Sequence, residues 1–118
     1  LDDAYNTNPV GARNALEVLG LNTDGRRVLV TPGMVELADI QDEENRKLGA
    51  FATRYATDIV LVGRSQTTAL QEGVRSTDFD PARLIIVDTV QEAIDWYQQE
   101  LGDGDAILFL NDLADNYL

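Results

Sequence analysis

Short apolar segments that alternate with segments of helical periodicity constrain the fold of this chain most. Four of these segments are rich in Val, Ile and Leu and have the length of buried strands: residues 27–31, 58–62, 84–87 and 106–110. Strands that alternate with helices form parallel sheets with right-handed crossovers. We therefore expect an α/β, Rossmann-like fold of three layers, with a mostly parallel sheet of about five to six strands and helices on both faces.

The intervening segments carry apolar residues at helical spacing. Gly20 is placed to cap the first of the predicted helices. Thr89 and Glu92 have the spacing of a capping box at the start of the last one, whose apolar stripe includes Val90. The predicted helices cover residues 9–19, 42–56, 66–73 and 90–101.

Composition excludes several classes of function. The chain has 118 residues, enough for one domain, and its net charge of −12 argues against binding to nucleic acids or anionic membranes. It has no Cys and no His, which excludes disulfides, thiolate chemistry and His-dependent triads. It also lacks an apolar run of the ~18 residues that a membrane span requires, so we expect no membrane insertion.

The first nine residues resemble the end of a strand followed by a polar turn and a helix start. Asn8 suits an N-cap and Pro9 suits the first helical turn. Asp3, Tyr5 and Asn6 therefore gather at the carboxyl end of a strand, where open α/β sheets bind ligands. Asp3 is an acceptor suited to a ribose diol, and Asn6 can donate to a phosphate. An ordinary capped turn explains the same spacing without a ligand.

Phosphate chemistry needs groups that this chain lacks. It has neither a Gly-x-x-x-x-Gly-Lys-(Ser/Thr) loop nor a Gly-x-Gly-x-x-Gly turn after a strand, and its single lysine, Lys47, falls in a predicted helix. A receiver-type phosphorylation site could use Asp2 and Asp3, but no acceptor Asp follows the strand over 58–62. A non-catalytic, flavodoxin-like nucleotide-binding module remains an alternative.

Two motifs resemble the C-terminal domain of the Mur ligases. Residues 2–9, Asp-Asp-Ala-Tyr-Asn-Thr-Asn-Pro, are similar to the Asp-Asp-(Ser/Ala)-Tyr-Asn-Ala-Asn-Pro motif that opens this domain. Residues 33–37, Gly-Met-Val-Glu-Leu, resemble the family's Gly-Asp-Met-x-Glu-Leu-Gly loop, followed at the family's distance by Leu48-Gly49. The resemblance covers the whole chain and is greatest to the members that use D-alanyl-D-alanine. Three positions depart from the family pattern: Gly33 replaces Asp, Ala38 replaces Gly, and Asn45 replaces a frequent His.

The resemblance implies roles for particular residues. Asp3 would hold the ribose of ATP and Asn6 would face its phosphates. The resemblance gives Tyr5 no role of its own: its ring can pack near the nucleotide or cover the sheet edge. The second loop would help to shape the site of the incoming amine. The family's Lys-Gly-Ser-Arg after the last strand is replaced by residues 110–113, Leu-Asn-Asp-Leu. Either D-alanyl-D-alanine is not the amine of this ligase, or another group binds the substrate carboxylate, for which Arg64 is our candidate. The expected substrate-positioning residues are Gly33, Met34, Glu36, Arg64, Asn111 and Asp112.

The resemblance also implies the activity. Residues 1–118 would be the single C-terminal domain of a larger cytoplasmic ligase of cell-wall synthesis, with the N-terminal and central domains outside this chain. Such a ligase uses ATP and Mg²⁺ to join D-alanyl-D-alanine to a UDP-N-acetylmuramoyl-tripeptide. The catalytic groups and the metal site belong to the central ATPase domain, so we expect this chain alone to be inactive. A folylpolyglutamate or muramyl-amino-acid ligase with a different amine is the alternative within the architecture.

Overall fold

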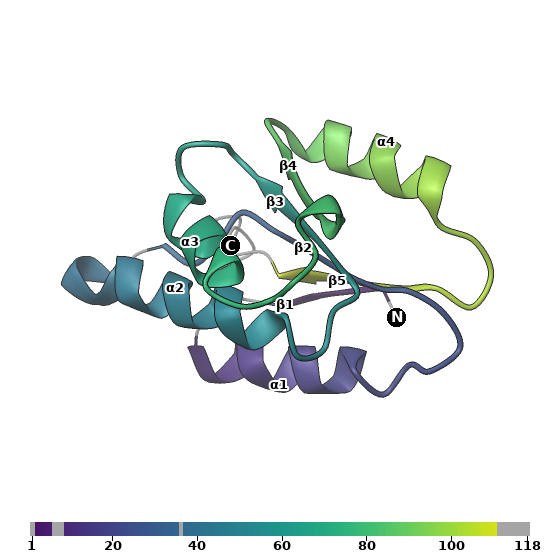
Figure 1. The fold of residues 1–118 in the computed structure, drawn as a ribbon, viewed down its shortest axis with the longest axis horizontal. Helices are drawn as coiled ribbons and strands as arrows, with labels where there is room; N and C mark the ends of the chain where they lie inside the picture. Colours follow the sequence, from purple (N-terminus) through teal and green to yellow (C-terminus); the bar gives the residue numbers. More distant parts are fainter. Residues whose placement is uncertain (1, 6–8, 36, 111–118) are drawn as a thin grey trace, which may run out of the picture.

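The computed structural model of the chain describes residues 2–5, 9–35 and 37–110 (Figure 1). Its strands form one sheet in the order β1-β5-β2-β3-β4, and every pair of neighbours is parallel. Five strands in the described ranges lie at the lower end of the expected number. Their bounds are β1 (Asp2–Tyr5), β2 (Arg27–Thr31), β3 (Asp58–Val62), β4 (Leu84–Val87) and β5 (Ala106–Leu110).

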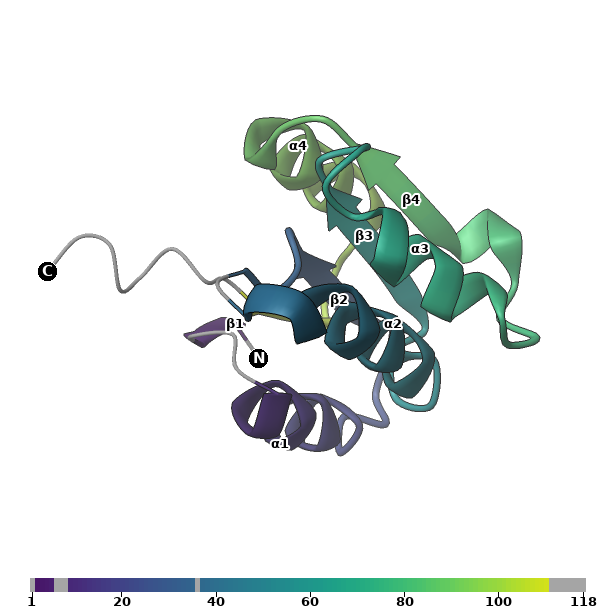
Figure 2. The ribbon, with the colours of Figure 1, turned by 90° about the vertical axis from the view of Figure 1, so that its left-hand side faces the viewer.

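Helices cover both faces of this sheet, which confirms the three-layer α/β fold. One face carries α1 (Pro9–Leu19), α2 (Gln41–Ala52) and α3 (Thr68–Arg75), and the other carries α4 (Val90–Glu100), as the two views show (Figures 1 and 2). The crossovers from β1 through β4 all advance in one direction across the sheet. The connection from β4 to β5 returns, and a right-handed return must use the opposite face.

The core consists of two apolar layers on either side of the sheet. Successive residues of a strand point to opposite faces. Leu29, Ile59 and Leu108 accordingly pack against the three-helix face, whereas Val28 and Val60 pack on the side of α4. All five are at most 1% exposed, so the inner strands are buried on both faces as their apolar sequences predict.

Helix α1 has the predicted bounds, but Gly20 serves a different purpose from the one expected. Its φ is not positive, so Gly20 does not end α1 in the left-handed conformation that is typical of a glycine C-cap. A Cβ at this position would lie 2.6 Å from Cδ1 of Tyr55. Gly20 therefore permits a close approach between the end of α1 and the chain that follows α2.

The ends of α2 and α3 differ from their predictions. A short helical turn, η1 (Ala38–Ile40), precedes α2, and α2 ends four residues before the predicted residue 56. At its end the Thr53 hydroxyl donates to the Ala50 carbonyl at 2.6 Å and thus competes with the helical ladder. Helix α3 begins and ends two residues later than predicted.

Helix α4 begins with the predicted capping box. Thr89 Oγ1 accepts from the Glu92 amide, and a carboxylate oxygen of Glu92 accepts from the Thr89 amide, both at 3.1 Å. Val90 was predicted to point inward, but it is 45% exposed, and α4 is buried one turn later, at Ala93. A second short turn, η2 (Pro81–Arg83), leads into β4.

Among the helices of the described ranges, none combines the length and the apolar character that crossing a bilayer requires.

Candidate functional site

The carboxyl edge of the sheet collects the ends of all five strands, because every strand runs in the same direction. In β1, Asp3 lies opposite Leu108 of β5 and Tyr5 lies opposite Leu110. The backbone of residues 2–5 therefore runs alongside the last strand to its end, although the two are more than 100 residues apart in sequence. Four of the predicted site residues lie outside the described residues: Asn6, Glu36, Asn111 and Asp112.

The loop after β2 reaches the same edge, next to β5. Gly33 has a positive φ of 92°, and its amide donates to Thr31 Oγ1 at 3.0 Å. Met34 is only 2% exposed and packs in the core on the three-helix face, so it contributes to this edge through its backbone. That backbone is held by Asn45 of α2.

The loop after β3 carries Arg64. Gly63 turns the chain with a φ of 99°, and its amide donates to the Val87 carbonyl at 2.8 Å. Arg64 Nε lies 3.7 Å from Asp88 Oδ1, and both side chains are 66% exposed. The chain leaves β3 towards α3 and leaves β4 towards α4, on opposite faces of the sheet. The Arg64–Asp88 pair thus lies at the topological switch point, where sheets of this kind bind ligands.

The predicted residues occupy different parts of this edge. Arg64 follows β3, and β3 is separated from β1 by β5 and β2. Strands in a sheet are about 4.8 Å apart, which places β1 and β3 roughly 14 Å from each other. The backbone of Asp3 and that of Arg64 therefore lie at different parts of the carboxyl edge.

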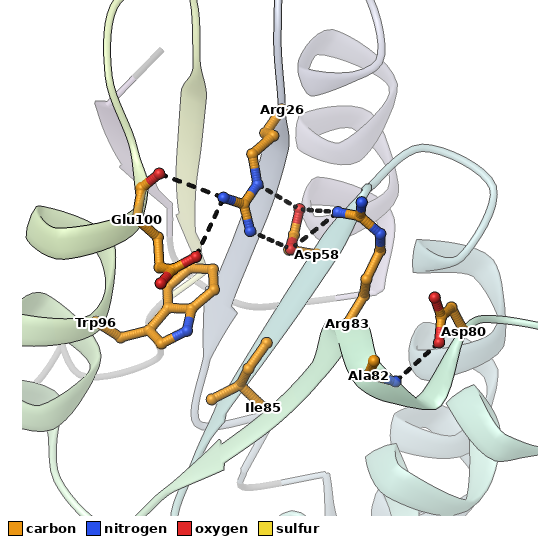
Figure 3. Close-up of a pocket in the computed structure, with 8 residues that line it drawn as sticks. All are labelled: Arg26, Asp58, Asp80, Ala82, Arg83, Ile85, Trp96 and Glu100. Carbon is orange, nitrogen blue, oxygen red and sulfur yellow. Dashed lines mark hydrogen bonds and ion pairs between the residues drawn. The ribbon is translucent and has the colours of Figure 1, made fainter.

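The opposite, amino edge of the sheet has a cavity of about 490 Å³ (Figure 3). Asp58, at the start of β3, is 1% exposed and lies in its wall. Arg26 donates to Asp58 through Nη2 at 2.7 Å and Nε at 3.2 Å, and Arg83 donates through Nη1 at 3.3 Å. Trp96 covers the Arg26 guanidinium at 5.5 Å from the ring centroid. The remaining lining residues are Asp80, Ala82, Ile85 and Glu100.

These contacts keep Asp58 ionised. Burial opposes its charge and would raise its pKa, but hydrogen bonds from Arg26 and Thr57 and the charges of Arg26 and Arg83 outweigh burial, so the pKa of Asp58 is lowered. The hydrogen bond to Asp58 in turn raises the pKa of Arg26. The Asp58 carboxylate thereby joins the starts of β2, β3 and β4. Sequence reasoning missed this cluster, since its only local signal is an acidic residue that opens an apolar strand.

In the described part of the chain, the lysine is paired and the acidic side chains form no cluster for a metal ion. Lys47 lies 3.4 Å from Glu44 and 3.5 Å from Glu43 on the same helix, and the hydrogen bond to Glu44 with both carboxylate charges raises its pKa. Within residues 2–5, 9–35 and 37–110, no three acidic side chains come together in a way that could hold a metal ion.

Comparisons with known proteins agree on one family. The family model described as "Mur ligase, glutamate ligase domain" matches residues 1–111. One crystal structure of MurF from Acinetobacter baumannii is 28% identical, with a TM-score of 0.66 over 92% of this chain and 23% of that chain. A second MurF structure from this organism is 26% identical, with a TM-score of 0.68 over 92% of this chain and 24% of that chain. The chain thus spans about a quarter of the length of these proteins. No curated protein sequence matches it.

Proposed function

Because the chain belongs to the glutamate ligase domain family of the Mur ligases, we propose that it positions substrates and closes over ATP in a peptidoglycan ligase. In this proposal it is the C-terminal domain of a cytoplasmic enzyme that joins D-alanyl-D-alanine to a UDP-N-acetylmuramoyl-tripeptide. The observation that carries the proposal is the arrangement of the two motifs. They lie about 25 residues apart in sequence, yet β1, formed by the start of the first motif, and the loop after β2, which carries the second, both reach the carboxyl edge, with β5 alone between β1 and β2.

The proposed reaction has two steps. ATP phosphorylates the carboxylate of the tripeptide, and the amine of the dipeptide then attacks the acyl phosphate and releases inorganic phosphate. The central domain of the same polypeptide would supply the phosphate loop and hold ATP and Mg²⁺. The part of the present domain would be to bring Asp3 to the ribose and Asn6 to the phosphates, with Tyr5 beside the nucleotide. Closure of the domain would exclude water, which otherwise hydrolyses an acyl phosphate.

The loop Gly33–Met34, with Glu36, would border the amine. We propose that Arg64 binds the carboxylate of that substrate, since residues 111 and 112, Asn and Asp, offer no cation after β5. Its ion pair with Asp88 is long and exposed, and pairs of this kind contribute less than about 1 kcal/mol, so a substrate carboxylate can displace Asp88 at small cost.

The test is phosphate release from ATP by the full-length enzyme with the UDP-linked tripeptide, measured with and without D-alanyl-D-alanine. Release that requires the dipeptide supports the proposal. Release that requires another amine retains the family and changes the substrate. Absence of release with every amine would overturn the enzymatic role and favour a non-catalytic nucleotide-binding module.

A further inference from the structure

Asn45 is a buried polar residue of α2 whose side chain faces the loop after β2. It is 5% exposed. Its Oδ1 accepts from the Met34 amide at 2.8 Å, and its Nδ2 donates to the Met34 carbonyl at 2.9 Å and to the Gln41 carbonyl at 3.1 Å. One side-chain amide thus satisfies both backbone groups of Met34, as a neighbouring strand would.

The two hydrogen bonds between Asn45 and Met34 determine the path of the backbone over Gly33–Val35. Met34 is anchored on one side by its core side chain and on the other by Asn45, while the Gly33 amide is held by Thr31. A Cβ at Gly33 would lie 3.2 Å from Asn45 Oδ1 and 3.0 Å from Leu70 Cδ1. Asn45 can therefore lie this close only because residue 33 is a glycine. Gly33 and Asn45 are also two of the three positions at which the chain departs from the family pattern.

We infer that Asn45 is a positioning residue for the amine substrate. It does not reach the carboxyl edge itself, and it acts by fixing the Met34 backbone and so the segment Gly33–Val35 beside β5. The inference rests on the proposed function, in which this segment borders the amine. Reacting groups must be placed to within about 1 Å for efficient reaction, so a small shift of the segment is costly.

The chain offers a matched control at the other end of β2. Thr57 Oγ1 accepts from the Arg27 amide at 2.8 Å and lies 3.1 Å from the Arg27 carbonyl, so it also holds the backbone of one strand residue, while its hydroxyl donates to Asp58 Oδ1 at 2.7 Å. Thr57 lies at the amino edge, away from the proposed site. Thr57→Val removes the side-chain contacts with Arg27 and the hydrogen bond to Asp58 while it retains the shape of the side chain.

The experiment compares Asn45→Ala, Asn45→Ser and Thr57→Val in the full-length enzyme, each assayed well below its own melting temperature. For Asn45→Ala we expect the KM for D-alanyl-D-alanine to rise about tenfold or more, and the KM for ATP to stay within about twofold. Asn45→Ser, whose hydroxyl can retain one bond, should fall between. Thr57→Val should lower the melting temperature without a change in the KM for the dipeptide.

A solely structural role predicts another result. In that case both Asn45 variants would lose thermal stability with the KM for the dipeptide unchanged, as in Thr57→Val, and the inference would be wrong while the proposed function stood. If the unsubstituted enzyme shows no dipeptide-dependent phosphate release, the proposed function fails first and the inference falls with it. Hydrogen exchange at the Met34 amide provides an independent check, because it should accelerate in Asn45→Ala and remain unchanged in Thr57→Val.

Discussion

At the residue scale, Asp58 is the most constrained charge in the described part of the chain. Its carboxylate is buried and accepts hydrogen bonds from Arg26, Arg83 and Thr57. Removal of Asp58 would leave Arg26, whose side chain is 30% exposed, and Arg83, whose side chain is 49% exposed, without their shared acceptor. The contact between three strand starts therefore depends on one side chain.

We expect Asp58→Ala to lower the free energy of unfolding by about 1–3 kcal/mol, since two partly exposed guanidinium groups lose their shared carboxylate. Urea denaturation monitored by circular dichroism measures this change. The matched control is Asp88→Ala, which removes an exposed pair with Arg64 and should change stability by less than about 1 kcal/mol. Equal losses of unfolding free energy in the two variants would show that Asp58 stabilises the fold no more than the exposed Asp88 does.

The lowered pKa of Asp58 predicts a pH dependence. The folded chain binds fewer protons at Asp58 than the unfolded chain, whose pKa for Asp is about 3.9. The stabilisation is therefore fully present above about pH 4 and is lost as the pH falls through the folded pKa. We expect the difference in unfolding free energy between the unsubstituted chain and Asp58→Asn to shrink below about pH 4.

Urea midpoints of both proteins, measured across this pH range, test the prediction, and the comparison cancels the effect of the overall charge of −12. A difference that stays constant down to about pH 2 would show that the charge of Asp58 is not responsible.

Asp3 is the residue on which nucleotide binding depends in the proposed function. Asp3→Ala in the full-length enzyme should raise the KM for ATP, with a loss of about 1–3 kcal/mol for an unpaired hydroxyl partner. Steady-state kinetics at saturating amine measure this. Asp103→Ala, an exposed carboxylate that precedes β5 at the amino edge, is the control and should leave the KM unchanged. An unchanged KM in Asp3→Ala would identify Asp3 as a residue of β1 without a role in nucleotide binding.

At the element scale, two glycines allow α2 and α3 to pack closely. A Cβ at Gly49 would overlap the Leu70 carbonyl oxygen, and one at Gly73 would overlap the Arg46 carbonyl oxygen. Both obstacles are backbone atoms of the opposite helix and cannot rotate away. The sequence places Gly49 after Leu48 in the second motif, and the contact with α3 supplies its physical reason.

Gly49→Ala and Gly73→Ala should each lower the free energy of unfolding by about 1–3 kcal/mol, because overpacking exceeds the gain in helix propensity of about 1 kcal/mol. Thermal unfolding of each variant measures the effect. At Gly102 a Cβ would meet nothing within 4 Å, so Gly102→Ala is the control and should not destabilise the chain. A rise in melting temperature for Gly49→Ala would mean that the helices separate without cost.

At the scale of the whole molecule, the described part of the chain holds one edge of a proposed active site but not the groups that transfer phosphate. The single lysine is paired with acidic residues on α2. We therefore expect the 118-residue chain to release no phosphate from ATP, with or without an amine, whereas the full-length enzyme does. A phosphate assay on equal molar amounts of the two proteins is the measurement. Phosphate release by the isolated chain would contradict the assignment of the phosphate-transferring groups to the central domain.

The sequence predicted those elements well whose signals lie among a few neighbouring residues. The strands over 27–31, 58–62, 84–87 and 106–110, the first helix and the Thr89–Glu92 capping box all match the structure. Hydrophobic periodicity and capping depend on residues within about one to three helical turns of each other, so both can be identified from a short stretch of sequence. The errors lie at helix ends, as at Thr53, where a side-chain hydrogen bond competes with the ladder.

What the sequence by itself determined is therefore the α/β class, most element bounds and the two motifs at the strand ends. Only the tertiary structure decided that β5 lies between β1 and β2, that Asp58 joins Arg26 and Arg83, and that Asn45 brackets Met34. The physical reason is distance along the chain. These contacts join residues 11 to more than 100 positions apart, and no local pattern specifies which distant segments meet when helices and strands pack into one core.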